Sequence, residues 1–346
     1  MRSAFIGIDV AFAKRKHLPV VICTWEEGRL IPQPLRRLEL TPPRGEGNVV
    51  SLDEDAVRHF ARRASAYVVG ACHALGLEPM RIGIDAPSAP CAHSIRRRAA
   101  EQAMDAARIS CFATPSAEAF AAIKVKVELH LSSGGTVARI PHSNQLWMLV
   151  GFALYEELSQ VAPCLEVFPH ATARAIGASA IHKSKAGAVE AQLAAAARYT
   201  GWPTGRVGEP RLSEIAWGTP HDQLDAYLSA WVAALEESDR VAHGQPPSDA
   251  IWVPRVTGDE GDSAQMEVSV RPTRRTPRER RAAAPVRPSG PSVAPLLCPG
   301  CGRHEFRRWP WGWDAHAAHA CEALSATDPI ERKAEYRRRF AAYFRR

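Results

Sequence analysis

Five acidic residues stand at positions where carboxylates could act together. Two of them end the repeated sequence Ile-Gly-Ile-Asp, at residues 6–9 and 82–85, and a third lies inside the apolar segment 165–168. An unpaired carboxylate buried in an apolar strand costs on the order of several kcal/mol. A metal cation can serve as the partner of several carboxylates at once. The candidate catalytic residues are Asp9, Asp85, Glu166, Asp222 and Asp225.

Carboxylate oxygens favour a hard divalent cation such as Mg²⁺ or Mn²⁺, which keeps coordination positions open for water and phosphate. Two such ions about 4 Å apart can activate water and stabilise the leaving oxygen of a phosphodiester. We expect Asp9, Asp85 and Asp225 to be the metal ligands. Other roles are open: Asp9 and Asp85 could each cap a turn, Asp222 could stabilise its own helix N-terminus, and Glu166 could be a satisfied core carboxylate.

A second set of potential ligands lies in the segment 298–321. Cys298 and Cys301 form a Cys-Pro-Gly-Cys sequence. Fourteen residues separate Cys301 from His316, and Cys321 follows. The spacing is close to that of a Cys₂His₂ finger and predicts a tetrahedral structural Zn²⁺ site. Zinc would supply the folding energy that a module of about fifty residues lacks. His319 could replace His316 or Cys321, and we prefer the set that contains His316 and Cys321.

Net charge is distributed unevenly along the chain. Residues 271–346 carry +10 and residues 1–270 carry −3, which together give the net charge of +7. A basic segment is the electrostatic footprint expected of a protein that binds phosphates, although a solvated tail would have a similar composition. We expect nucleic acid as the partner, DNA rather than RNA. The candidate contacts are Arg274, Arg275, Arg278, Arg307, Arg308, Arg337 and Arg338.

Length and composition exclude several classes of protein. A chain of 346 residues with 46% hydrophobic content can fill a large core. Its apolar stretches fall well short of the ~20 residues needed to cross a bilayer. Asp9 interrupts the first apolar segment, where a secretory signal would stay apolar. Most of the eight cysteines are isolated, which argues against a disulfide scaffold. We expect a cytoplasmic protein.

The acidic residues need strands and one late helix to position them. Apolar periodicity predicts strands at 4–10, 18–24 and 35–40 as an antiparallel meander, with further strands at 81–85, 164–168 and, as a closing edge, 250–253. Helices are predicted from Ser51 or Asp53 to about Leu75, at 94–109, 116–129, 144–160 and 185–199, and from the N-cap Thr219 onward. We divide the chain into a catalytic domain at 1–254, a disordered Arg/Pro-rich linker at 255–295, and a zinc finger with a basic helix at 296–346.

This order of elements resembles the RNase H fold, an α/β fold in which a three-strand antiparallel meander continues into parallel strands flanked by helices. Four segments also resemble domain-of-unknown-function family four-two-nine, predicted RNase H-like nucleases: residues 5–9, 84–87, 166–170 and 221–226. The resemblance covers about residues 3–254 and implies metal-dependent hydrolysis of nucleic-acid phosphodiester bonds. The chain departs from the family at His170, where an acidic residue is usual, and in its three arginines at 96–98.

Two other functions are open. The protein could be a non-catalytic, zinc-containing DNA-binding protein whose RNase H-like site has decayed. It could also be an actin-like ATPase or sugar kinase, since that superfamily shares the fold and begins with a Gly-x-Asp strand. The chain shows no convincing pair of glycine-rich phosphate turns, which that class needs. A metal-dependent nuclease tethered to a zinc finger that holds nucleic acid is therefore the leading prediction.

Overall fold

The computed structural model describes residues 1–178 and 187–256, together with short strands between 296 and 313 and residue 335. The chain divides into two compact units, residues 1–266 and 267–346. Within the described residues, no helix combines the length and the apolar character that a membrane crossing requires.

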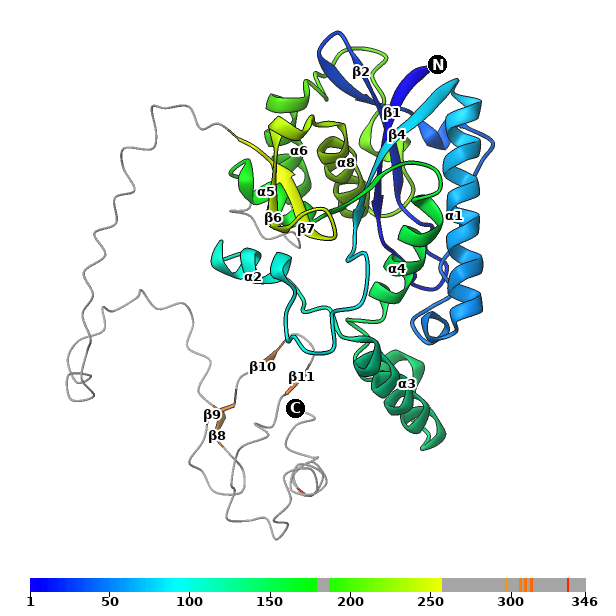
Figure 1. Ribbon diagram of the computed structural model, residues 1–346, viewed down its shortest axis with the longest axis vertical. Helices are drawn as coiled ribbons and strands as arrows, with labels where there is room; N and C mark the ends of the chain where they lie inside the picture. The colour runs from blue at the N-terminus through cyan, green and yellow to red at the C-terminus, as the bar shows by residue number, and fades with distance from the viewer. Residues whose placement is uncertain are drawn as a thin grey trace, which may run out of the picture. The chain divides into compact units, whose positions relative to one another are not determined.

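A mixed seven-stranded sheet forms the centre of the first unit, with the strand order β3-β2-β1-β4-β5-β7-β6 (Figure 1). The first three strands form an antiparallel meander, as predicted, although the third strand is not the one predicted. Strands β4, β5 and β7 continue the sheet in parallel with β1, and β6 closes it antiparallel to β7. The strands are β1 (Arg2–Asp9), β2 (Val20–Glu26), β3 (Arg29–Pro32), β4 (Leu77–Asp85), β5 (Cys164–Val167), β6 (Arg240–Gln245) and β7 (Asp249–Pro254).

Two strand predictions were wrong. The third strand is β3 rather than residues 35–40, because Glu27 and Gly28, both at positive φ, make a two-residue turn that returns the chain directly beside β2. Residues Leu35–Arg37 form a short 3₁₀ helix instead. Strand β7 is not the edge of the sheet, since β6 pairs with its outer side.

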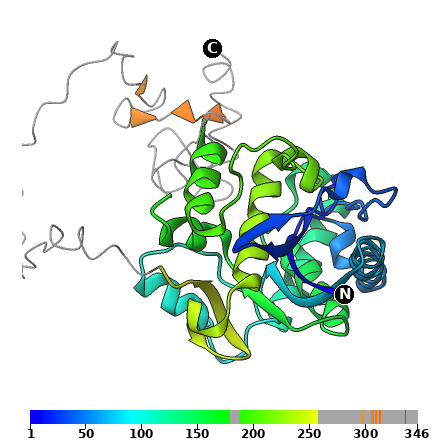
Figure 2. The same cartoon turned by 90° about the horizontal axis from the view of Figure 1, so that it is seen from above.

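Helices cover both faces of the sheet (Figures 1 and 2). On one face, α1 and α4 bury Phe60 and Leu154 against Ile8 and Ile84. On the other, α8 lies along the strands and packs with α5 and α6. The helices are α1 (Glu54–Ala74), α2 (Ala99–Ala106), α3 (Ala117–Ser132), α4 (Trp147–Leu158), α5 (Pro169–Ala175), α6 (Ala188–Thr200), α7 (Leu212–Ile215) and α8 (Pro220–Ala234).

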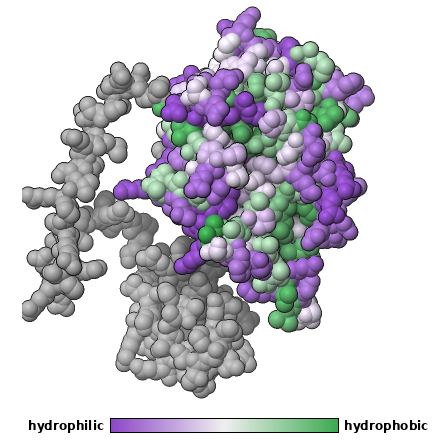
Figure 3. All heavy atoms as spheres, in the orientation of Figure 1, coloured by the Kyte–Doolittle hydropathy of each residue, from purple (hydrophilic) through white to green (hydrophobic). Residues whose placement is uncertain are grey.

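Side-chain caps fix the starts of α1 and α8. Asp53 accepts hydrogen bonds from the backbone N–H groups of Asp55 and Ala56 at the start of α1. Thr219 caps α8, as the sequence predicts. Helix α3 is partly uncovered: Val125 and Leu129 are 63% and 67% exposed, and apolar side chains reach the surface at the end of the unit that carries α3 (Figure 3).

In the second unit the structure describes two short antiparallel strand pairs, β8 (Leu296–Leu297) with β9 (Glu305–Phe306) and β10 (Arg308–Trp309) with β11 (Gly312–Trp313). Arg308 lies in β10, where the backbone alone is described. The other calls on this unit fall outside the described residues: the zinc ligands Cys298, Cys301, His316 and Cys321, the alternative ligand His319, and Arg274, Arg275, Arg278, Arg307, Arg337 and Arg338.

Candidate functional site

The two Ile-Gly-Ile-Asp sequences lie side by side in the sheet. They end the parallel strands β1 and β4, and Asp9 is the register partner of Asp85, as Gly7 is of Gly83. Alternate residues of a strand point to the same face, so each glycine shares a face with the aspartate two residues later. The isoleucines point to the opposite face and are buried against α1 and α4. The repeated sequence therefore places two carboxylates side by side at the carboxyl ends of β1 and β4, on the same face of the sheet.

The two glycines bring the backbone of α8 onto that face. A β-carbon at Gly7 would overlap the carbonyl oxygen of Ala226, and one at Gly83 would overlap the carbonyl oxygen of Ser229. Only residues without a side chain permit so close a contact. Asp225 immediately precedes Ala226, so the close packing carries this third carboxylate to the end of the strands that holds Asp9 and Asp85.

Arg81 fixes the other end of α8. It lies on β4, on the same face as Gly83, and its Nη1 donates hydrogen bonds to the carbonyl oxygens of Ala233 and Leu235, both at 2.7 Å. A cation at a helix C-terminus satisfies carbonyls that have no partner within the helix. Helix α8 thus runs antiparallel to β4 and is held at both ends of the strand.

The acids meet at a cavity of about 680 Å³ at the carboxyl ends of the central strands. Asp9, Asp85, Glu166 and Asp225 all line it. The side chain of Asp225 is 13% exposed, and its Oδ2 lies 2.9 Å from Nε2 of His221, one helical turn earlier. Four of the five acids singled out in the sequence therefore share one cavity.

Glu166 approaches the cavity from the opposite face of the sheet. Its register partner on β4 is Ile84, not Asp85, so its side chain leaves the sheet on the face opposite to that of Asp85. Its Oε1 and Oε2 accept hydrogen bonds from Nη2 and Nη1 of Arg98, at 2.5 and 2.8 Å, and both side chains are 8% exposed. These contacts agree with the alternative role considered for Glu166, that of a core carboxylate whose charge has a partner.

Comparison with known proteins identifies the family of the chain that forms this site. The model of the family described as "Protein of unknown function (DUF429)" matches residues 7–249. The chain belongs to this family. No curated protein and no solved structure matches the chain. The matched region of this DUF429 protein includes the four predicted acids that line the cavity.

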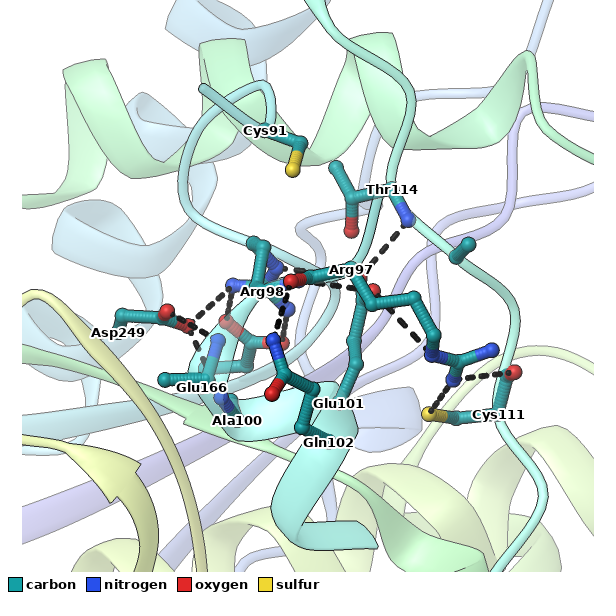
Figure 4. A network of polar contacts seen from close by, with 12 residues as sticks. Cys91, Arg97, Arg98, Ala100, Glu101, Gln102, Cys111, Thr114, Glu166 and Asp249 are labelled. Atoms are coloured by element: carbon teal, nitrogen blue, oxygen red, sulfur yellow. Dashed lines mark hydrogen bonds and ion pairs between the residues drawn. The ribbon is translucent and has the colours of Figure 1, made fainter. Parts of the chain in front are cut away.

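The guanidinium of Arg98 is the centre of a buried polar network in the DUF429 region (Figure 4). Besides Glu166, it contacts Glu101 through Nε at 3.2 Å and Asp249 through Nη1 at 3.6 Å. Burial raises the pKa of Glu166, and the hydrogen bonds and charge of Arg98 oppose this rise. Burial alone would lower the pKa of Arg98, but Glu166 and Glu101 raise it, so the guanidinium stays charged.

The same network fixes the chain that follows α2. Glu101 Oε1 accepts a hydrogen bond from the backbone N–H of Thr114 at 2.7 Å. Arg97 Nη2 donates to the carbonyl oxygen and to Sγ of Cys111, at 3.2 and 3.3 Å. The sequence showed only a run of arginines at 96–98. The structural role of Arg98 was missed because its partner on β5, Glu166, lies 68 residues later in the sequence.

Asp222 has a structural position at the start of α8. Its Oδ2 accepts the backbone N–H of Thr219 at 3.0 Å, which completes a capping box with the Thr219 hydroxyl. Lys16 Nζ lies 3.8 Å from the same oxygen. Asp222 does not line the cavity. Its contacts are those of a residue that stabilises the N-terminus of its own helix, which was the alternative role considered for it.

The carboxylate oxygens at the cavity are the kind of ligand that a hard cation prefers. Within the described part of the chain, no group of three or more His, Cys, Asp and Glu side chains lies close enough together to hold an ion. Magnesium usually takes only one or two carboxylates and completes its shell with water and substrate phosphate. The in-register pair Asp9 and Asp85 has the number of carboxylates that such a partial site would use.

Proposed function

We propose that this protein is a divalent-cation-dependent nuclease that hydrolyses phosphodiester bonds of nucleic acid. The observation that carries the proposal is the pairing of Asp9 with Asp85 at the ends of adjacent parallel strands, with Asp225 of α8 on the wall of the same cavity. These three carboxylates come from three separate elements, and a divalent cation would offset part of their negative charge and allow the anionic phosphodiester to approach.

The proposal includes an RNase H-like arrangement. Support comes from the strand order β3-β2-β1-β4-β5, in which an antiparallel meander continues into parallel strands. The acids follow the order expected of that fold, since they lie on the first strand, the fourth strand and a late helix.

In this proposal Asp9 and Asp85 are the residues that would hold the cation, Mg²⁺ or Mn²⁺. When bound, it would supply Lewis-acid activation of the attacking water and stabilisation of the leaving oxygen. Asp225 lines the same cavity, and its Oδ2 lies 2.9 Å from Nε2 of His221. Glu166 is assigned no ligand role, because Arg98 engages both of its oxygens; it holds α2 in position instead.

We also propose that the second unit contains a Zn²⁺-binding finger and holds nucleic acid, DNA rather than RNA. The support is the Cys-x₂-Cys sequence with its downstream His and Cys and the net charge of +10 in residues 271–346. Tethering such a module to the first unit would raise the local concentration of nucleic acid at the cavity.

End-labelled single-stranded DNA, duplex DNA and RNA, incubated with Mg²⁺ or Mn²⁺, test the proposal. We expect cleavage that EDTA abolishes and that falls at least about a hundredfold in Asp9→Asn and Asp85→Asn. Asp222→Asn is the matched control, because it changes an acid outside the cavity wall and keeps a capping side chain; it should retain activity.

The two alternative functions give different results. A folded, zinc-loaded protein that binds DNA but cleaves none of these substrates would be the non-catalytic binding protein. Tight ATP binding measured by calorimetry would favour the actin-like ATPase. Either result would overturn the nuclease proposal.

A further inference from the structure

One wall of the cavity carries an exposed aromatic ring. Phe112 lines the cavity, yet 57% of its surface is exposed. Single exposed apolar residues are common on protein surfaces, so exposure alone carries no argument. Phe112 differs from an ordinary exposed side chain because the backbone on both sides of it is held in place.

Hydrogen bonds fix the backbone around Phe112. The carbonyl oxygen of Cys111 accepts from Arg97 at 3.2 Å, and the N–H of Thr114 donates to Glu101 at 2.7 Å. Glu101 is 1% exposed and also contacts Arg98, so the segment is tied to the buried network (Figure 4). The ring is therefore held at the cavity wall, and the described residues leave more than half of its surface exposed.

Other apolar side chains continue this wall. Trp147, Met148 and Phe168 line the same cavity. Phe168 is half-buried and makes an edge contact with His170, with ring centroids 5.8 Å apart. A volume of about 680 Å³ lies in the range of small-molecule pockets and exceeds the space that a cation with a few waters occupies. The cavity thus joins aromatic surface to the carboxylates of Asp9 and Asp85.

We propose that this cavity takes one unstacked nucleobase, which packs on the ring of Phe112 while its phosphate lies at Asp9 and Asp85. Bases stack on exposed aromatic rings irrespective of sequence, and a base inside a duplex cannot enter a pocket until it leaves its stack. The substrate class is therefore single-stranded or locally unpaired nucleic acid. This inference rests on the proposed function, because it uses the same acids to place the phosphate.

Binding measurements on the full-length protein test the inference. The probes are a fluorescein-labelled 12-nucleotide DNA strand, its RNA counterpart, the same DNA as a duplex, and a strand of equal length built of abasic sites, with Ca²⁺ in place of Mg²⁺. We expect Phe112→Ala to weaken single-strand binding roughly tenfold, the usual effect of one lost stacking contact. Phe112→Trp should retain affinity, and Phe112→Leu should lose it.

The controls separate stacking from charge and from folding. Leu129→Ala removes another exposed apolar side chain, which lies outside the cavity wall, and should leave affinity unchanged. Duplex and abasic probes should bind more weakly than the normal strand and should not respond to Phe112→Ala. Thermal unfolding of each variant checks that the fold is kept.

The possible failures are distinguishable. If Phe112→Ala binds the single strand as well as the unmodified protein does, or if the abasic strand binds equally well, the base pocket is refuted, and metal-dependent cleavage that needs Asp9 can still stand. If single strands bind through Phe112 but no substrate is cleaved with Mg²⁺ or Mn²⁺, the nuclease proposal fails and the base pocket stands.

Discussion

Gly7 and Ala226 are in direct backbone contact, although 219 positions separate them in the sequence. The space that a β-carbon of Gly7 would need is filled by the carbonyl oxygen of Ala226 and the amide nitrogen of Ala230. Gly83, the register partner of Gly7, makes the same kind of contact with Ser229. The glycines of the two Ile-Gly-Ile-Asp sequences thus set the distance of α8 from the sheet, and with it the position of Asp225.

Gly7→Ala and Gly83→Ala should therefore destabilise the first unit. Helix backbone cannot give way as the end of a flexible side chain can, so we expect a loss of about 1–3 kcal/mol or more in the free energy of unfolding, measured by urea titration. Gly70→Ala is the matched control: Gly70 lies inside α1, and an added β-carbon would meet only Leu40 Cδ1 at 3.6 Å. That substitution should stabilise α1 by up to about 1 kcal/mol. Equal effects at Gly7 and Gly70 would contradict the close contact.

Much of this architecture could be predicted from short-range patterns. The apolar strands ending in Asp9 and Asp85, the helical periodicity of α1 and the capped start of α8 are local features, and their interpretation needs no knowledge of distant residues. The shared orientation of Gly7 and Asp9 also follows from the two-residue period of a strand.

Other features depend on contacts that the sequence does not reveal. Strand β6, with the sequence Arg-Val-Ala-His-Gly-Gln, has too few apolar residues to show a strand pattern and is defined by its pairing with β7. The face on which Glu166 lies follows from the register between β4 and β5, which depends on long-range pairing. Its partner Arg98 lies 68 residues earlier, so no local spacing could have indicated the pair.

Removing Arg98 should be costly, because it leaves Glu166 buried without its cation. We expect Arg98→Met to lower the free energy of unfolding by roughly 3–5 kcal/mol. The double variant Arg98→Met with Glu166→Gln should lose less than the sum of the two single variants, since neither charge is then left alone. Urea titration of the four proteins gives this coupling. Additive losses would show that the two side chains do not interact.

The stability of the first unit should depend on pH through His243 of β6. Burial lowers the pKa of this imidazole below its usual value of about 6.5. Because the pKa is lowered in the folded state, the unfolded chain takes up the proton first as pH falls. The stability that depends on neutral His243 is therefore present above pH ~6.5 and is lost as pH falls through the folded pKa. In His243→Gln, stability should fall less between pH 7.5 and 5, measured by urea midpoints. His59→Gln, an exposed histidine of α1, should follow the unmodified protein. A His243→Gln curve parallel to that of the unmodified protein would refute this origin of the pH dependence.

The proposed zinc finger predicts a metal content that is independent of the cavity. We expect about one Zn²⁺ per chain by elemental analysis, since Cys298, Cys301, His316 and Cys321 form a single four-ligand set. Cys298→Ser should lower the zinc content and weaken DNA binding. Cys111→Ser, which changes a thiol of the first unit, should leave zinc unchanged. DNA affinity of the unmodified protein should also fall steeply with added salt, because the basic segment binds phosphates by releasing counterions. Unchanged zinc in Cys298→Ser would refute this ligand set and leave the proposal for the acidic cavity untouched.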